Sequence, residues 1–136
     1  MSGNMEQKST GPNMRIFFCQ QIDVQQDVNR RVIEKEFGSQ VMFFPLPCSG
    51  RIESLHLVRA LESGADKVYL ITCPEGACRF REGNFRARKR LVFAQGLIEE
   101  IGFKRERLEL ITLPAGTKTT IDKLARELIT REGKSE

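Results

Sequence analysis

The sequence predicts an α/β protein: a single three-layer domain with an open parallel sheet of about four strands and βα repeats, Rossmann-like or flavodoxin-like. Three observations carry this prediction. Four short apolar runs alternate with four stretches whose apolar residues recur at helical spacing, glycine ends three of these stretches, and the first run is almost entirely apolar, as in a buried strand. Strands that alternate with helices form a parallel sheet, because the crossover connections place helices on both faces.

The first βα unit begins after a polar tail. Residues 14–18 are apolar and aromatic, which predicts a buried strand that stops at Cys19. Asp23 is placed to cap the helix that follows, and Gly38 is placed to end it. The apolar residues that recur along this helix are Val24, Val28, Val32, Ile33 and Phe37.

The second unit repeats this order. Residues 40–44 predict a second strand, which Pro45 and Pro47 are expected to break. The loop that follows carries Cys48, and a second helix then runs to Gly64. The expected apolar face of this helix comprises Ile52, Leu55, Val58 and Leu61.

The last two units complete the sheet. Residues 67–72 predict a third strand and residues 108–113 a fourth. The third helix is expected to end at Gly102, and the last helix to be capped near Thr119 or Thr120. The expected apolar faces are Ala87, Leu91, Ala94, Ile98 and Ile101 on the third helix, and Ile121, Leu124, Leu128 and Ile129 on the last.

Composition limits the class of protein. The chain has 136 residues, 40% hydrophobic and 29% charged, with a net charge of +4, and this length fits one domain, which we place at residues 14–136. The polar residues 1–13 are expected to form a flexible tail, because they lack the apolar core of a signal peptide. Apolar runs fall short of the roughly 20 residues of a membrane helix, and RNA-recognition signatures are absent. We therefore expect a cytoplasmic protein without membrane insertion and without a nucleic-acid partner.

All four cysteines of the chain follow the end of a strand-like run. They are Cys19, Cys48, Cys73 and Cys78. Because the carboxyl ends of parallel strands share one edge of a sheet, these thiols are expected to converge there. In a reducing compartment such thiols more often bind metal or do chemistry than form disulfides, and they suit an iron–sulfur cluster better than zinc at this spacing. The alternative is that they are small apolar core residues.

A second pattern overlaps the cysteines. Cys73 and Arg79 satisfy a C-x5-R motif between a strand and a helix, as in enzymes whose loop N–H groups and arginine hold an oxyanion while a thiolate attacks. Thr72 stands where phosphatases of this kind usually have histidine. His56, the only histidine, and Ser49 provide no catalytic triad.

Six cations surround the start of the third helix. Such a run usually forms a solvated helix face; the alternative is that it binds an acidic partner or offsets the negative charge of a thiolate-bound cluster. Cations are unfavourable at a helix N-terminus, which favours a compensating anion there. The residues are Arg79, Arg81, Arg86, Arg88, Lys89 and Arg90.

Two cysteine motifs resemble those of the delta subunit of methyl-viologen-reducing hydrogenases, a small iron–sulfur protein associated with heterodisulfide reductase. They are Cys48-Ser-Gly-Arg51 and Cys73-Pro-Glu-Gly-Ala-Cys-Arg-Phe-Arg-Glu-Gly-Asn84. The resemblance covers about residues 14–130 and is specific, since the motifs occur in order with matching separations. Further similar positions are Gly64-Ala65-Asp66, Ala87, Arg90 and Glu106-Arg107-Leu108.

This resemblance implies a non-catalytic electron-transfer subunit of an oxidoreductase complex in anaerobic energy metabolism. It implies a [2Fe–2S] cluster bound by all four cysteines, Cys19, Cys48, Cys73 and Cys78. The implied partners are the flavin subunit of a heterodisulfide-reductase-like complex and a hydrogenase or formate dehydrogenase subunit. Ile22 departs from the family, because it stands where a further cysteine is usual. Two other hypotheses stay open: a cluster-free adaptor that keeps the fold and docking surfaces, and a C-x5-R enzyme with Cys73 as nucleophile.

Overall fold

Two apolar strands form the centre of the sheet in the computed structural model, which describes residues 13–19, 22–46, 53–72, 83–113 and 119–134. These strands are β1 (Met14–Cys19) and β3 (Lys67–Thr72), and the edge strands are β2 (Val41–Leu46) and β4 (Leu108–Thr112). All neighbours pair in parallel, and the order across the sheet is β2-β1-β3-β4. The predicted open parallel sheet is confirmed.

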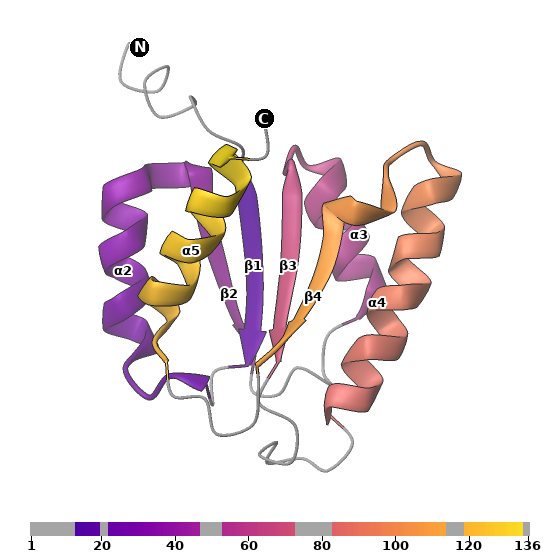
Figure 1. Cartoon of the computed structure of the whole chain (residues 1–136). Helices are drawn as coiled ribbons and strands as arrows, with labels where there is room; N and C mark the ends of the chain where they lie inside the picture. Colours follow the sequence, from indigo (N-terminus) through magenta and orange to yellow (C-terminus); the bar gives the residue numbers. More distant parts are fainter. Residues whose placement is uncertain (1–12, 20–21, 47–52, 73–82, 114–118, 135–136) are drawn as a thin grey trace.

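Helices cover both faces of the sheet, which gives three layers (Figure 1). Helices α2 (Gln26–Phe37) and α5 (Ile121–Lys134) lie on one face, and α3 (Ser54–Glu62) and α4 (Gly83–Glu100) lie on the other. Two short 3-10 turns, η2 (Gly38–Gln40) and η4 (Arg105–Arg107), precede β2 and β4. Among the described helices, none combines the length and the apolar character needed to cross a membrane.

Alternate residues of the central strands enter two separate cores. In β1, Ile16 and Phe18 are fully buried together with Tyr69 and Ile71 of β3, on the side of α2 and α5. Phe17 lies between them in the sequence and packs on the side of α3 and α4. This follows from the alternation of side chains along a strand. Because helices cover both faces, both central strands are apolar at nearly every position.

Strand β2 is longer than its prolines suggested. The sequence predicted a break at Pro45, but the strand continues through Pro45 to Leu46. Pro45 is opposite Phe18 of β1 in the register of the sheet. Proline has no N–H to donate, and an edge strand accommodates it because one of its sides has no neighbouring strand.

The apolar faces of three helices also differ from the prediction. In α2 only Ile33 is buried, whereas Val24 precedes the helix and is 97% exposed. Helix α2 offers two apolar stripes, and the stripe that contains Ile33 faces the sheet. The predicted face residues that prove exposed are Val24, Val28 and Val32 at α2, Leu55 on α3 and Ile101 just after α4. Helical spacing identifies a helix, but where two stripes compete it does not select the buried one.

Candidate functional site at the carboxyl edge of the sheet

The three strands that precede the cysteines end side by side. Strand β1 lies between β2 and β3; Cys19 pairs with Leu46, and Phe18 pairs with Ile71. Strands β2 and β3 therefore end, at Leu46 and Thr72, level with Cys19. Neighbouring strands are about 4.8 Å apart, so the three segments leave the sheet within roughly 10 Å of one another, at the edge where the arrowheads meet in Figure 1.

Of the four predicted ligands, Cys19 lies in the described part of the chain. Its side chain ends β1 and is 1% exposed. Cys48, Cys73 and Cys78 lie outside the described residues; in the sequence, Cys48 comes two positions after β2 and Cys73 directly follows β3. Within the described ranges, no three His, Cys, Asp or Glu side chains come together as a metal site. The four-cysteine site stays a prediction.

A buried carboxylate fastens the segment that follows Cys19. Asp23 is 4% exposed. Its Oδ1 accepts the backbone N–H of Gln25 at 2.9 Å, and its Oδ2 accepts Asn29 Nδ2 and the backbone N–H of Ile121, both at 2.8 Å. Ile121 is the first residue of α5, 98 positions further along the chain. Asp23 thus joins the starts of α2 and α5 at the carboxyl edge.

These hydrogen bonds also keep Asp23 charged. Burial alone would raise the pKa of its carboxyl, but hydrogen bonds from Asn29, Ile121 and Gln25 outweigh burial and hold the pKa below its ordinary value. The positive ends of two helix dipoles lie beside the same carboxylate and favour the anion. Asp23 is therefore ionised at neutral pH.

The capping of the last helix differs from the prediction. The sequence placed this cap at Thr119 or Thr120, but the Oγ1 of Thr120 makes no hydrogen bond in the described structure. The acceptor for the first N–H of α5 is Asp23 instead. The sequence also placed Asp23 as the cap of α2. Its carboxylate instead accepts the N–H of Gln25 in a turn before α2, which starts after Gln25. Sequence reasoning missed the bond to α5 because it joins distant residues.

Three other residues near this edge have structural roles. Ile22, at the position of the expected further cysteine, is partly buried against the core on the side of α2 and α5. Thr72 is fully buried, and its hydroxyl donates to Thr112 Oγ1 at 3.2 Å, which joins the ends of β3 and β4. His56 is exposed, and its Nδ1 accepts the backbone N–H of Glu53 at 3.4 Å as part of a helix cap.

Part of the predicted basic stretch lies on α4, which begins at the carboxyl edge (Figure 1). The first three of these residues are exposed, and Arg90 is half-buried with an ion pair of 3.8 Å to Glu53, the cap residue before α3. Their charges lie beside the edge at which the cysteines are expected. The structure describes Arg86, Arg88, Lys89 and Arg90, whereas Arg79 and Arg81 lie outside the described residues.

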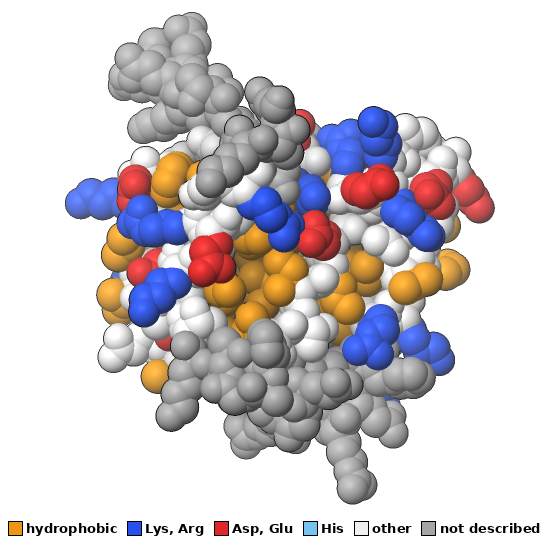
Figure 2. Space-filling view, in the orientation of Figure 1, with side chains coloured by type: hydrophobic (Ala, Val, Ile, Leu, Met, Phe, Trp, Pro, Cys, Tyr) orange, Lys and Arg blue, Asp and Glu red, His pale blue; other side chains and the backbone are white. Residues whose placement is uncertain are grey.

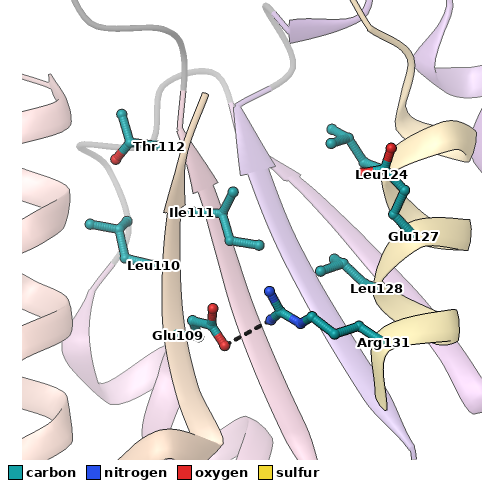
Figure 3. Close-up of a pocket in the computed structure, with 8 residues that line it drawn as sticks. All are labelled: Glu109, Leu110, Ile111, Thr112, Leu124, Glu127, Leu128 and Arg131. Atoms are coloured by element: carbon teal, nitrogen blue, oxygen red, sulfur yellow. Dashed lines mark hydrogen bonds and ion pairs between the residues drawn. The ribbon is translucent and has the colours of Figure 1, made fainter. Parts of the chain in front are cut away.

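A groove of ≈ 430 Å³ lies between β4 and α5, and the sequence did not predict it. Arg131 and Glu109 close one end with an ion pair of 2.9 Å (Figure 3). Arg131 also donates to the hydroxyl of Tyr69 at 3.1 Å. Burial opposes the charge of Arg131, but the hydrogen bonds to Tyr69 and Glu109 raise its pKa. Figure 2 shows hydrophobic side chains on this face, with charged side chains above and beside them. The lining residues are Glu109, Leu110, Ile111, Thr112, Leu124, Glu127, Leu128 and Arg131.

Comparison with known proteins gives one family. Residues 14–132 match the family described as methyl-viologen-reducing hydrogenase, delta subunit. The chain is 27% identical over 96 residues to the vhu iron-sulfur subunit of the F420-non-reducing hydrogenase of Methanocaldococcus jannaschii, a match that covers 71% of this chain and 72% of that protein. It is 42% identical over 65 residues to the iron-sulfur subunit of the F420-non-reducing hydrogenase of Archaeoglobus profundus, over 48% of this chain and 47% of that protein.

Another relative is much longer than this chain. It is one of the subunits of the ferredoxin/F420H2-dependent CoB-CoM heterodisulfide reductase of Methanosarcina acetivorans. The chain is 33% identical to it over 85 residues, which cover 60% of this chain and 11% of that protein. A segment similar to this chain is thus a small part of that reductase protein. The similarity therefore extends both to proteins named as hydrogenase subunits and to proteins named as heterodisulfide reductase subunits.

Proposed function

The chain belongs to the family of methyl-viologen-reducing hydrogenase delta subunits, and from this premise we propose that it is an electron-transfer subunit. In this proposal, a [2Fe–2S] cluster is bound by Cys19, Cys48, Cys73 and Cys78. The protein passes electrons between a hydrogenase or formate dehydrogenase and the flavin subunit of a heterodisulfide-reductase-like complex in the cytoplasm. Relatives named as hydrogenase iron-sulfur subunits support the proposed electron donor. A relative named as a heterodisulfide reductase subunit supports the proposed electron acceptor.

The alignment of the three strand ends is the observation that carries the proposal. Cys19 is at the end of β1, and the strands on both sides of it end at the same level, at Leu46 and Thr72. Cys48 and Cys73 follow those two ends by two residues and one residue in the sequence. With this register, the strands that precede three of the cysteines in the sequence end at one edge of the sheet, which is where such folds bind ligands.

The burial of Cys19 fits a ligand role. A buried thiolate is costly unless a cation lies beside it, and a metal ion meets that need. Four thiolates are the ligand set of [2Fe–2S] clusters, which accept and release single electrons when bound. The four cysteines of the chain provide that set with none to spare.

Residues around the proposed site would affect its rigidity and its electrostatic potential. Asp23, four positions after Cys19, bonds to the starts of two helices and would help to hold this edge of the sheet together around the site. Arg86 and Arg88 lie on the first turns of α4, and their positive charge would favour the reduced cluster and attract an acidic partner surface.

Anaerobic purification tests the cluster directly. We expect about two iron atoms and two acid-labile sulfides per chain, visible absorption, and an EPR signal after reduction. Each single substitution of Cys19, Cys48, Cys73 or Cys78 by Ser should remove most of the iron, because the chain has no other thiol. The matched control is His56→Ala, which removes the only histidine from an exposed position and should leave the iron content unchanged.

Two outcomes would contradict the cluster. A colourless, iron-free protein that still binds the reductase would identify a cluster-free adaptor. An oxyanion-dependent activity that is lost with Cys73→Ser but kept with Cys19→Ser would identify a C-x5-R enzyme, since a shared metal site makes both cysteines necessary.

A further inference from the structure

The outer face of α4 carries apolar side chains that the fold does not use. Val92 and Phe93 are 52% and 62% exposed. Together they form a small apolar patch, and an interaction surface has apolar side chains of this kind at its centre. The opposite face of α4 supplies the core with Ala87, Leu91, Ala94 and Ile98.

Gly96 lies one turn beyond this apolar pair on the same face. A Cβ at this position would meet no atom within 4 Å, so packing in the described structure does not require glycine. Glycine weakens the interior of a helix relative to alanine. Its presence is explained if another side chain approaches the α4 backbone closely at this point.

Opposite charges flank the apolar centre of this face. Arg88 and Lys89 are exposed before it, and Glu99 and Glu100 are exposed after it. Glu99 follows Arg88 by 11 positions, and Glu100 follows Lys89 by 11 positions. This spacing is about three helical turns, so the members of each pair lie on one line along the helix. The face is therefore complementary to a copy of itself turned end to end.

We propose that a second copy of this chain docks on this face through an antiparallel pair of α4 helices. Reversal of one helix brings Lys89 of each copy near Glu100 of the other, and Arg88 near Glu99, which in the single chain pairs with Arg105 at 3.6 Å. One set of residues then forms both halves of the contact, as in an isologous dimer. A parallel pair is disfavoured because it would set basic ends against each other.

The centre of the dimer is apolar. Val92 of each copy packs over Gly96 of the other, where the missing side chain leaves room. The two Phe93 side chains lie next to the two-fold axis, so both exposed apolar residues become buried. This arrangement accounts for the apolar pair and for the glycine, which the fold of a single chain does not explain.

The dimer does not depend on the proposed cluster. Helix α4 begins at the carboxyl edge of its own sheet, so an antiparallel pair places the two edges at opposite ends and leaves both open to other proteins (Figure 1). The helix has 18 residues and is about 27 Å long, so the contact is smaller than a standard stable interface. We therefore expect a dissociation constant on the order of micromolar.

Sedimentation velocity of the full chain tests the dimer. The measurement covers about 1 to 500 µM protein, with a reductant that prevents cysteine cross-links, at low and high salt. Gly96→Leu should raise the dissociation constant about tenfold or more while the circular dichroism of the chain is kept, because the site has open space. The matched control is Val24→Ser, at a 97% exposed position just before α2, and it should leave the dissociation constant unchanged.

Charge reversal tests the antiparallel geometry. The variant with Arg88→Glu and Lys89→Glu, and the variant with Glu99→Lys and Glu100→Lys, should each fail to self-associate because like charges then meet at both ends. A mixture of the two variants should form a heterodimer, since opposite charges then meet at both ends. A wild-type chain that stays monomeric at every concentration overturns the proposal, and so does a dimer that Gly96→Leu leaves intact or a mixture of folded variants that stays monomeric.

Discussion

Removal of the Asp23 carboxylate should loosen the carboxyl edge of the sheet. Asp23 accepts three hydrogen bonds of 2.8 to 2.9 Å, and one of their donors, the backbone N–H of Ile121, is buried. In Asp23→Ala that N–H loses its acceptor, which costs about 1–3 kcal/mol. The N–H of Gln25 and the amide of Asn29 can reach water, so each loss costs about 0.5–1 kcal/mol. We expect a loss of about 2–5 kcal/mol of unfolding free energy.

Two further variants separate the hydrogen bonds from the charge. Asp23→Asn keeps one oxygen, which can accept from Ile121 and Asn29, but turns an NH2 group toward the N–H of Gln25; we expect a loss of about 1–2 kcal/mol. The matched control is Asp27→Ala, which removes an exposed carboxylate paired with Arg30 at 2.8 Å and should cost under about 1 kcal/mol. Urea unfolding followed by circular dichroism gives the three values. A loss below about 1 kcal/mol for Asp23→Ala would refute the reasoning.

The stability that Asp23 provides should depend on pH in one direction. Its folded pKa is lowered from the ordinary value of 3.8, so the unfolded chain binds the proton more readily than the folded chain. The contribution of the Asp23 carboxylate to the unfolding free energy is therefore fully present above the unfolded pKa and is lost as pH falls through the folded pKa. Unfolding free energies of wild type and Asp23→Asn should differ at neutral pH and converge in acid. A difference that grew as the pH fell would contradict this sign.

Two substitution pairs test the packing and the backbone, each in dilute protein. Phe18→Leu should lower the unfolding free energy by about 1–2 kcal/mol, because Phe18 is fully buried and packs edge-to-face against Phe43, with ring centroids 6.2 Å apart. Phe93→Leu, on the exposed face of α4, should change the unfolding free energy by less than about 0.5 kcal/mol. Gly102→Ala should lower the unfolding free energy by about 1–2 kcal/mol, because Gly102 has a φ of 104°. Gly96→Ala, inside α4, should raise the unfolding free energy by about 0.5–1 kcal/mol, because alanine favours a helix and the site has open space. Equal effects within either pair would contradict the structural assignments.

The sequence predicted an element correctly where its apolar residues fitted only one strand or one helix face. Residues 67–72 were predicted as a strand and form β3 with those bounds, because the run is apolar and has no alternative helical stripe. The four core residues of α4 from Ala87 to Ile98 were predicted for the same reason. The prediction for α2 held for Ile33 and Phe37, which pack in the core, and was wrong for its three valines, because two apolar stripes competed and only contact with the sheet decides which of them is buried.

The candidate site was predictable only in part. Chain order and strand ends sufficed to place cysteines after β1, β2 and β3, since parallel strands share a carboxyl edge. The bond from Asp23 to Ile121 could not be predicted, because local sequence carries no signal for a contact across 98 positions. The groove beside Arg131 had no signal either, since it exists only because α5 leaves part of β4 uncovered.

The starts of the helices give a reason why an anionic cluster would suit this edge. Each helix begins at the carboxyl edge and directs the positive end of its dipole there. Three of them have a carboxylate at that end: Asp27 in α2, the cap residue Glu53 in α3, and Asp122 in α5. Helix α4 has no acidic residue in its first turn; in the sequence Glu82 directly precedes it, and cations follow within two turns. This is also the helix that follows Cys73 and Cys78 in the sequence. At α4 the single carboxylate in the sequence, Glu82, stands among six cations, and a thiolate-bound cluster would add negative charge there.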